Sequence, residues 1–109
     1  MSDAVPIEVS VTDAAAAVSG GNAWLLDCRE PDEWQTARIE GATLIPMNQT
    51  PDRLGEIPSD RPVIVHCHHG MRSLRVARFL RDNGYPDARS MAGGIDAWST
   101  EVDADVPRY

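Results

Sequence analysis

The segment PVIVHCHHGMRS, residues 62–73, constrains the fold of this chain more than any other. Its three consecutive β-branched residues predict a strand at 62–66 that is covered on both faces, as strands of parallel sheets are. A short loop containing Gly70 follows, and a helix is predicted over about 72–83. Cys67 therefore lies where a buried strand turns into a helix.

Predicted strands and helices alternate along the rest of the chain. Strands are predicted at 7–9, 24–27 and 88–91, and within 39–46 a glycine turn leads into a short strand that Pro46 ends. Helices are predicted at 13–19 (capped by Thr12), 30–36 and 95–99. Residues 47–60 are predicted to be loop with one helical turn near Asp52–Leu54, because they contain two prolines and a glycine. The alternation indicates an α/β domain with a largely parallel sheet, in which sites form beyond the carboxyl ends of the strands.

Composition excludes several classes of function. A chain of 109 residues is expected to form a single domain, 1–109, with 100–109 as a C-terminal tail. The formal charge of −7 argues against a nucleic-acid surface, and the absence of lysine excludes Schiff-base chemistry. No apolar run is long enough to span a membrane, so no membrane partner is expected. Residues 1–6 contain no secretion signal and only two cysteines occur, so we expect a cytoplasmic protein without a disulfide framework.

Cys67 is the candidate nucleophile. Backbone N–H groups in such a loop, and the N-terminus of the following helix, favour a thiolate. A thiol with an ordinary pKa of about 8.5 is only about 3% ionised at neutral pH. Lowering its pKa by about two units, worth roughly 2.7 kcal/mol, would make the thiolate the main form. We therefore predict an active loop made of Cys67 and the residues that follow it, which are His68, His69, Gly70, Met71, Arg72 and Ser73.

Four segments in order along the chain resemble the single-domain rhodanese family of sulfurtransferases. Residues 27–34, DCREPDEW, resemble the family's Asp-x-Arg-x-x-x-Glu-(Tyr/Trp) segment. Residues 38–46, RIEGATLIP, resemble His-Ile-x-Gly-Ala-x-x-Ile-Pro, with Arg38 where histidine is usual. Residues 67–73, CHHGMRS, are similar to the active loop Cys-x-x-Gly-x-Arg-Ser, and residues 91–98, MAGGIDAW, resemble the closing Gly-Gly-x-x-x-Trp.

The resemblance implies a rhodanese-like three-layer fold of about five mainly parallel strands flanked by helices. It also implies sulfur transfer through a persulfide on Cys67. The donor would be a small anionic sulfur compound such as thiosulfate, or a persulfide, and the acceptor cyanide, a thiol or a protein. No cofactor is implied. Arg72 would either add positive charge to the pocket or brace the loop.

Three other functions stay open. A non-catalytic sulfur relay or docking module would use the same cysteine to carry sulfur for a partner enzyme. A cysteine phosphatase is disfavoured, because those enzymes place five residues between cysteine and arginine, whereas four separate Cys67 from Arg72 here. Arsenate reduction, which related folds perform, is a weaker alternative.

Other side chains around these motifs have simpler interpretations. The run from His66 to His69 is not expected to bind a metal, because neighbouring strand residues point to opposite faces. Cys28 follows a predicted strand and is interpreted as a buried filler. The alternative is a second thiol close to Cys67, which would resolve a persulfide or form a disulfide on oxidation. An internal set of salt bridges is expected among Asp27, Arg29 and Glu33. Three tryptophans are expected to anchor the core, namely Trp24, Trp34 and Trp98.

Overall fold

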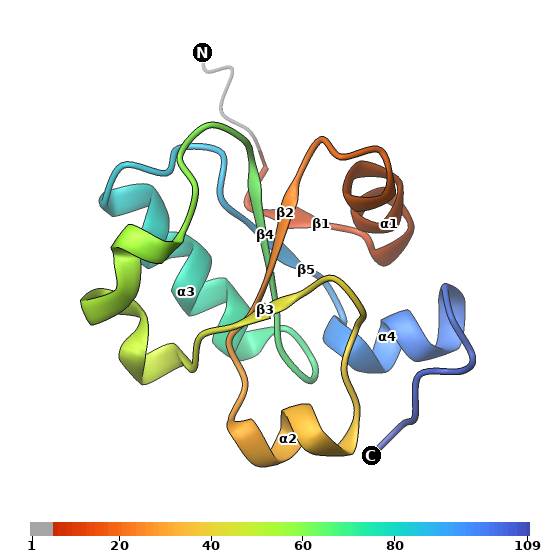
Figure 1. Cartoon of the computed structure of the whole chain (residues 1–109). Helices are drawn as coiled ribbons and strands as arrows, with labels where there is room; N and C mark the ends of the chain where they lie inside the picture. Colours follow the sequence, from red (N-terminus) through yellow and green to blue (C-terminus); the bar gives the residue numbers. More distant parts are fainter. Residues whose placement is uncertain (1–5) are drawn as a thin grey trace.

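Five strands form one sheet in which every pair is parallel (Figure 1). A computed structural model of the chain describes residues 6–109, so most of the N-terminal segment considered above lies outside it. The strands are β1 (Glu8–Val9), β2 (Trp24–Asp27), β3 (Thr43–Leu44), β4 (Val63–His66) and β5 (Arg89–Met91), in the spatial order β1-β5-β4-β2-β3. The predicted α/β fold with five mainly parallel strands is confirmed.

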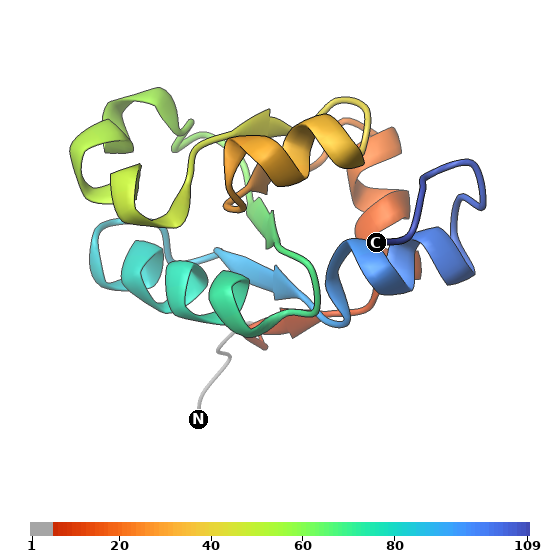
Figure 2. The same ribbon diagram turned by 90° about the horizontal axis from the view of Figure 1, so that it is seen from below.

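Helices cover both faces of this sheet, which gives three layers. They are α1 (Val11–Ser19), α2 (Pro31–Thr36), the 3-10 helix η1 (Met47–Glu56), α3 (Met71–Asp82) and α4 (Gly94–Glu101). One hydrophobic cluster joins α1 and α4 to the sheet, and a second joins α3 and η1 to it. Figure 2 shows the two groups of helices on opposite sides of the strands. No helix in residues 6–109 is long and apolar enough to cross a membrane.

The central strand β4 shows why the sequence folds this way. All four of its residues are buried. Val63 and Val65 belong to the cluster under α3, whereas Ile64 belongs to the cluster under α1 and α4. Successive side chains of a strand point to opposite faces, so a continuous apolar run requires cover on both. The end of β4, and Cys67 after it, is thereby held in the middle of the molecule.

Three local predictions are wrong. The first helix begins at Val11, and its N-cap is Ser10, whose Oγ accepts the Asp13 N–H at 3.1 Å, rather than Thr12. Segment 47–60 is not mainly loop, because Met47–Glu56 is a 3-10 helix interrupted at Arg53; the Tyr85 hydroxyl, from beyond α3, donates to two carbonyls at its end. Trp34 is only half-buried and belongs to neither hydrophobic cluster.

Candidate active site

The candidate site is the loop between β4 and α3, at the carboxyl end of the sheet's middle strand (Figure 1). Cys67 lies directly after β4 and is only 1% exposed. Gly70 is the N-cap of α3 and has a left-handed backbone, with φ at +116°. Only glycine adopts this conformation without steric cost, so Gly70 allows the chain to turn back over the cysteine.

The sulfur of Cys67 caps α3. It accepts the N–H of Gly70 at 3.1 Å and the N–H of Ser73, in the first turn of α3, at 3.4 Å. The Ser73 hydroxyl lies 3.4 Å from the same sulfur. Gly70 has no side chain to satisfy these donors, so the sulfur takes the position that a serine or aspartate oxygen has at an ordinary N-cap. A negative charge is stabilised there by the helix dipole.

These contacts lower the pKa of Cys67 to about 4. Hydrogen bonding from Cys28 has the largest effect, and burial of the sulfur opposes it. The Ser73 hydroxyl and the two backbone N–H groups lower the pKa further. Cys67 is therefore a thiolate at neutral pH, which is the nucleophilic form of cysteine.

Cys28 lies beside Cys67, at the end of β2. Asp27 and His66 are register partners in the two neighbouring strands, and each cysteine follows one of them. The Cys28 thiol is fully buried, and its hydrogen bond to Cys67, together with burial, raises its pKa far above the usual range. Cys28 is therefore a neutral thiol that stabilises the neighbouring thiolate. The structure shows that it is both buried and next to Cys67.

Arg72 braces the loop from outside. Its guanidinium donates to both carboxylate oxygens of Glu33 in α2, at 2.7 and 2.9 Å. This pairing holds the pKa of Glu33 at about 2. The expected salt-bridge set is therefore wrong for Glu33, whose partner is Arg72 rather than Asp27 or Arg29. Since the carboxylate neutralises the guanidinium, Arg72 is not among the main groups that lower the pKa of Cys67, which are Cys28, Ser73 and the N–H of Gly70.

The other two members of that set form a buried ion pair behind the loop. Arg29 and Asp27 are both fully buried, and Arg29 Nη2 lies 2.7 Å from Asp27 Oδ2. Arg29 also donates to the hydroxyl of Tyr109 at 2.6 Å, and Tyr109 donates to Glu33 at 2.9 Å. The neighbouring His66 is fully buried and neutral, because burial lowers its pKa. The tail is therefore a strap that connects the buried pair to the brace of the loop.

The start of α4 supports the loop from the other side. The N–H groups of Ile95 and Asp96 donate to the carbonyls of Cys67 and His68, at 2.8 and 3.2 Å. A side chain on Gly94 would overlap both carbonyls, and its φ of +61° is left-handed. The Gly-Gly pair before α4 is therefore needed for close approach of two backbones.

The rim of the loop is formed by longer side chains. Met71 is 71% exposed, the imidazole of His69 is 68% exposed, and the ring of His68 stacks on Tyr109 with centroids 4.1 Å apart. His68, His69 and Asp96 carry possible metal-ligand atoms that all lie within 4.8 Å of one another. Asp96 is also paired with Arg108 at 3.0 Å, and the expectation of no metal stays a prediction.

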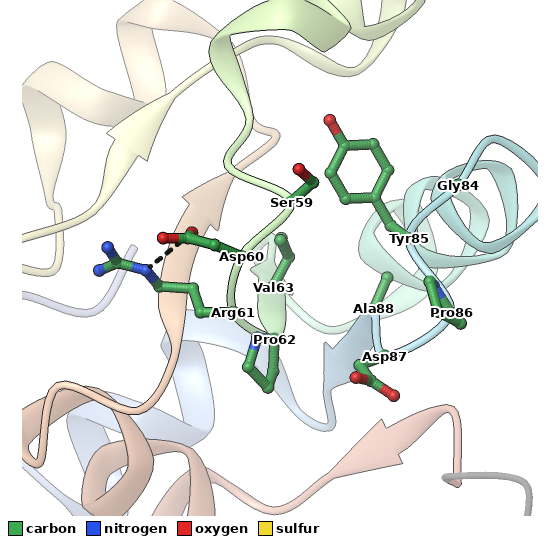
Figure 3. A pocket seen from close by; sticks show the side chains of 10 residues that line it. All are labelled: Ser59, Asp60, Arg61, Pro62, Val63, Gly84, Tyr85, Pro86, Asp87 and Ala88. Carbon is green, nitrogen blue, oxygen red and sulfur yellow. Dashed lines mark hydrogen bonds and ion pairs between the residues drawn. The ribbon is translucent and has the colours of Figure 1, made fainter.

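One open hollow lies away from this loop. Figure 3 shows a cavity of about 190 Å³ at the amino end of β4, between segments 59–63 and 84–88. Its charged groups are the Asp60–Arg61 pair, at 3.4 Å, and Asp87. It contains neither a thiol nor an imidazole, so the cysteine chemistry belongs to the opposite end of the strand.

Two residues near the loop were not predicted from the sequence. Ser90, fully buried in β5, has its hydroxyl 2.7 Å from that of Ser73 and 3.4 Å from the Gly70 carbonyl. Tyr109 is separated from Arg29 by 80 positions in the chain. A lone serine or tyrosine carries no local pattern, so only the tertiary structure identifies them.

A buried thiolate that follows the middle strand of a parallel sheet and caps the next helix is typical of proteins in which cysteine is the nucleophile. The model of the rhodanese-like domain matches residues 10–101, and the chain belongs to this family. The predicted rhodanese-like fold and family are therefore confirmed.

Similar proteins include thiosulfate sulfurtransferase GlpE of Tolumonas auensis, which is 32% identical over 83% of this chain and 85% of its own length. Probable adenylyltransferase/sulfurtransferase MoeZ of Mycobacterium tuberculosis is 34% identical over 84% of this chain. The chain spans only 24% of MoeZ. The solved structure of reduced Bacillus anthracis CoADR-RHD superimposes on this chain with a TM-score of 0.84 at 31% identity. The match covers 94% of this chain and 18% of the CoADR-RHD chain.

Proposed function

We propose that this protein is a sulfurtransferase that carries sulfane sulfur on Cys67. The observation that supports this most is the Cys67 thiolate, whose sulfur accepts two backbone N–H groups and lies beside the Ser73 hydroxyl and the Cys28 thiol. A fixed, ionised thiol of this kind attacks a sulfur–sulfur bond without a separate base. The relatives named sulfurtransferases support the same conclusion.

The reaction has two steps. The Cys67 thiolate attacks the outer sulfur of thiosulfate or of a persulfide, and the bond between the two donor sulfurs breaks. Sulfite or a thiol leaves, and the negative charge comes to lie on the outer sulfur of a Cys67 persulfide. The N–H groups of the loop stabilise this charge, and Ser73 adds its hydroxyl. Cyanide, a thiol or a protein then takes the outer sulfur and restores the thiolate.

Charge around the loop bears on the choice of donor. Arg72 is neutralised by Glu33, and the whole chain carries a formal charge of −7. Long-range attraction of a dianion such as thiosulfate is therefore weak, and a low-charge persulfide donor fits the loop better. We infer that thiosulfate serves as an assay substrate of modest efficiency. We place this reaction in the cytoplasm, where thiols stay reduced.

The relay function is the second candidate. The exposed Met71 side chain stands next to the loop, and methionine at a rim is suited to contact with another protein. In that case the persulfide would be loaded and unloaded by partner proteins, and turnover with small molecules would be slow.

Intact mass spectrometry after incubation with thiosulfate tests the proposal. Wild-type protein should gain one sulfur, about 32 Da, on Cys67, and Cys67→Ser should gain none. A cyanide assay then separates the two candidates, because an enzyme turns over thiosulfate repeatedly. A relay accepts sulfur only from a protein or organic persulfide. Absence of the adduct with every donor in both the wild type and Cys28→Ser, or its presence on Cys28 alone, would refute the mechanism.

A further inference from the structure

The proposed transfer cycle uses one thiol, yet the structure places two together. The chain after β2 and the chain after β4 are neighbours, because the Cys28 N–H donates to the His66 carbonyl at 3.1 Å. Cys28 and Cys67 belong to the same hydrophobic cluster, so their side chains lie on the same face of the sheet. Adjacent strands run about 4.8 Å apart, and disulfides join Cα atoms that are about 4.4–6.8 Å apart. The separation expected for two such positions therefore lies within the range that a disulfide spans.

We propose that Cys28 is a resolving thiol, which discharges the Cys67 persulfide as hydrosulfide and leaves a Cys28–Cys67 disulfide. This gives the protein a further activity, sulfide release, and it rests on the proposed formation of a persulfide. The Cys28 sulfur attacks the inner sulfur of the persulfide. The bond between the inner and outer sulfurs breaks, and the outer sulfur departs.

The step balances without any added oxidant. The reactants are the persulfide anion of Cys67 and the neutral thiol of Cys28, and the products are the disulfide and the hydrosulfide anion. The proton of Cys28 moves to the departing sulfur, so one negative charge is present before and after. The sulfane sulfur is reduced to sulfide, and the two cysteine sulfurs are oxidised to the disulfide. A dithiol reductant then restores both thiols for another cycle.

The surroundings of Cys28 favour this reaction only after loading. In the unloaded protein the thiolate of Cys67 lies beside Cys28, and a second negative charge there is strongly disfavoured. Loading moves the charge one bond outward, from the sulfur beside Cys28 to the outer sulfur of the persulfide. Both residues are at most 1% exposed, so an external thiol reaches the inner sulfur less readily than Cys28 does.

Single-turnover measurements under anaerobic conditions test the proposal. Protein is loaded with thiosulfate, freed of excess donor, and followed by intact mass and by sulfide trapping. The wild type should lose the adduct of about 32 Da, end about 2 Da below its reduced mass, and release one sulfide per loaded chain. Cys28→Ser keeps a hydroxyl donor at the same place, and its adduct should persist about tenfold longer or more.

Two results would overturn the proposal. One is a wild-type adduct that persists as long as that of Cys28→Ser, without sulfide release. The other is failure of the wild type to form an internal disulfide in buffers of oxidised and reduced glutathione, which tests the pairing without any persulfide. Absence of adduct in every variant would instead contradict the proposed function, so the two failures are distinguishable.

Discussion

Replacing Ser73 with alanine tests how the loop stabilises the thiolate. The substitution removes one hydroxyl donor at 3.4 Å from the Cys67 sulfur and leaves the backbone N–H of residue 73 in place. A hydrogen bond to a charged group is worth about 1.5–3 kcal/mol. This contact is long, and the hydroxyl also reaches Gly70 and Ser90, so we take the lower limit. Since about 1.4 kcal/mol corresponds to one pKa unit, the pKa of Cys67 should rise by about one unit.

The measurement is the rate of alkylation by iodoacetamide between about pH 3 and pH 8. The modified residue is identified by mass spectrometry. The wild type should lose reactivity as the pH falls through about 4, the pKa of Cys67. Ser73→Ala should lose it about one unit higher, and at neutral pH both proteins should remain thiolates.

Ser90→Ala is the matched control. It removes a hydrogen-bond partner of Ser73 but no donor to the sulfur, so the acid limb of its profile should not move upward. Thermal melting of each variant checks that the fold is intact. If the profiles of Ser73→Ala and the wild type superimpose, the hydroxyl does not stabilise the thiolate and the assignment of this contact is wrong.

Two further predictions concern the supports of the loop. Glu33→Gln should lower the free energy of unfolding in urea by about 1 kcal/mol at pH 7, because the pair with Arg72 is partly exposed and screened by water. The folded pKa of Glu33, about 2, lies below its usual 4.5, so the wild type should lose this stabilisation as the pH falls from 4.5 toward 2. An equal difference between the two proteins at pH 7 and pH 2 would contradict this. Gly94→Ala should cost about 2–3 kcal/mol of stability and most of the Cys67 reactivity, whereas Gly55→Ala, which meets nothing within 4 Å, should be nearly neutral. Unchanged melting of Gly94→Ala would refute the close approach of α4 to the loop.

Much of the fold could be predicted because its signals are local. The buried run before Cys67 predicts a central strand, and Gly84 after α3 predicts where that helix ends. Its φ of +99° shows why glycine is suited to that position. The four family segments predicted the loop and its approximate supports. Segment 47–60 was predicted only as loop with one helical turn. The hydroxyl of Tyr85, which donates to carbonyls at the end of this segment, comes from a distant part of the chain and gives no local signal.

The sequence by itself determined that Cys67 follows a buried strand and precedes a helix, since apolar runs, glycine and helix periodicity are read from neighbouring residues. Only the tertiary structure decided what surrounds the sulfur. The pairing of Arg72 with Glu33, the hydrogen bond between the Ser73 and Ser90 hydroxyls and the adjacency of Cys28 to Cys67 all depend on strand order and register. Strand order and register are set when both faces of the sheet are buried together. They are therefore properties of the packed molecule and not of any one segment.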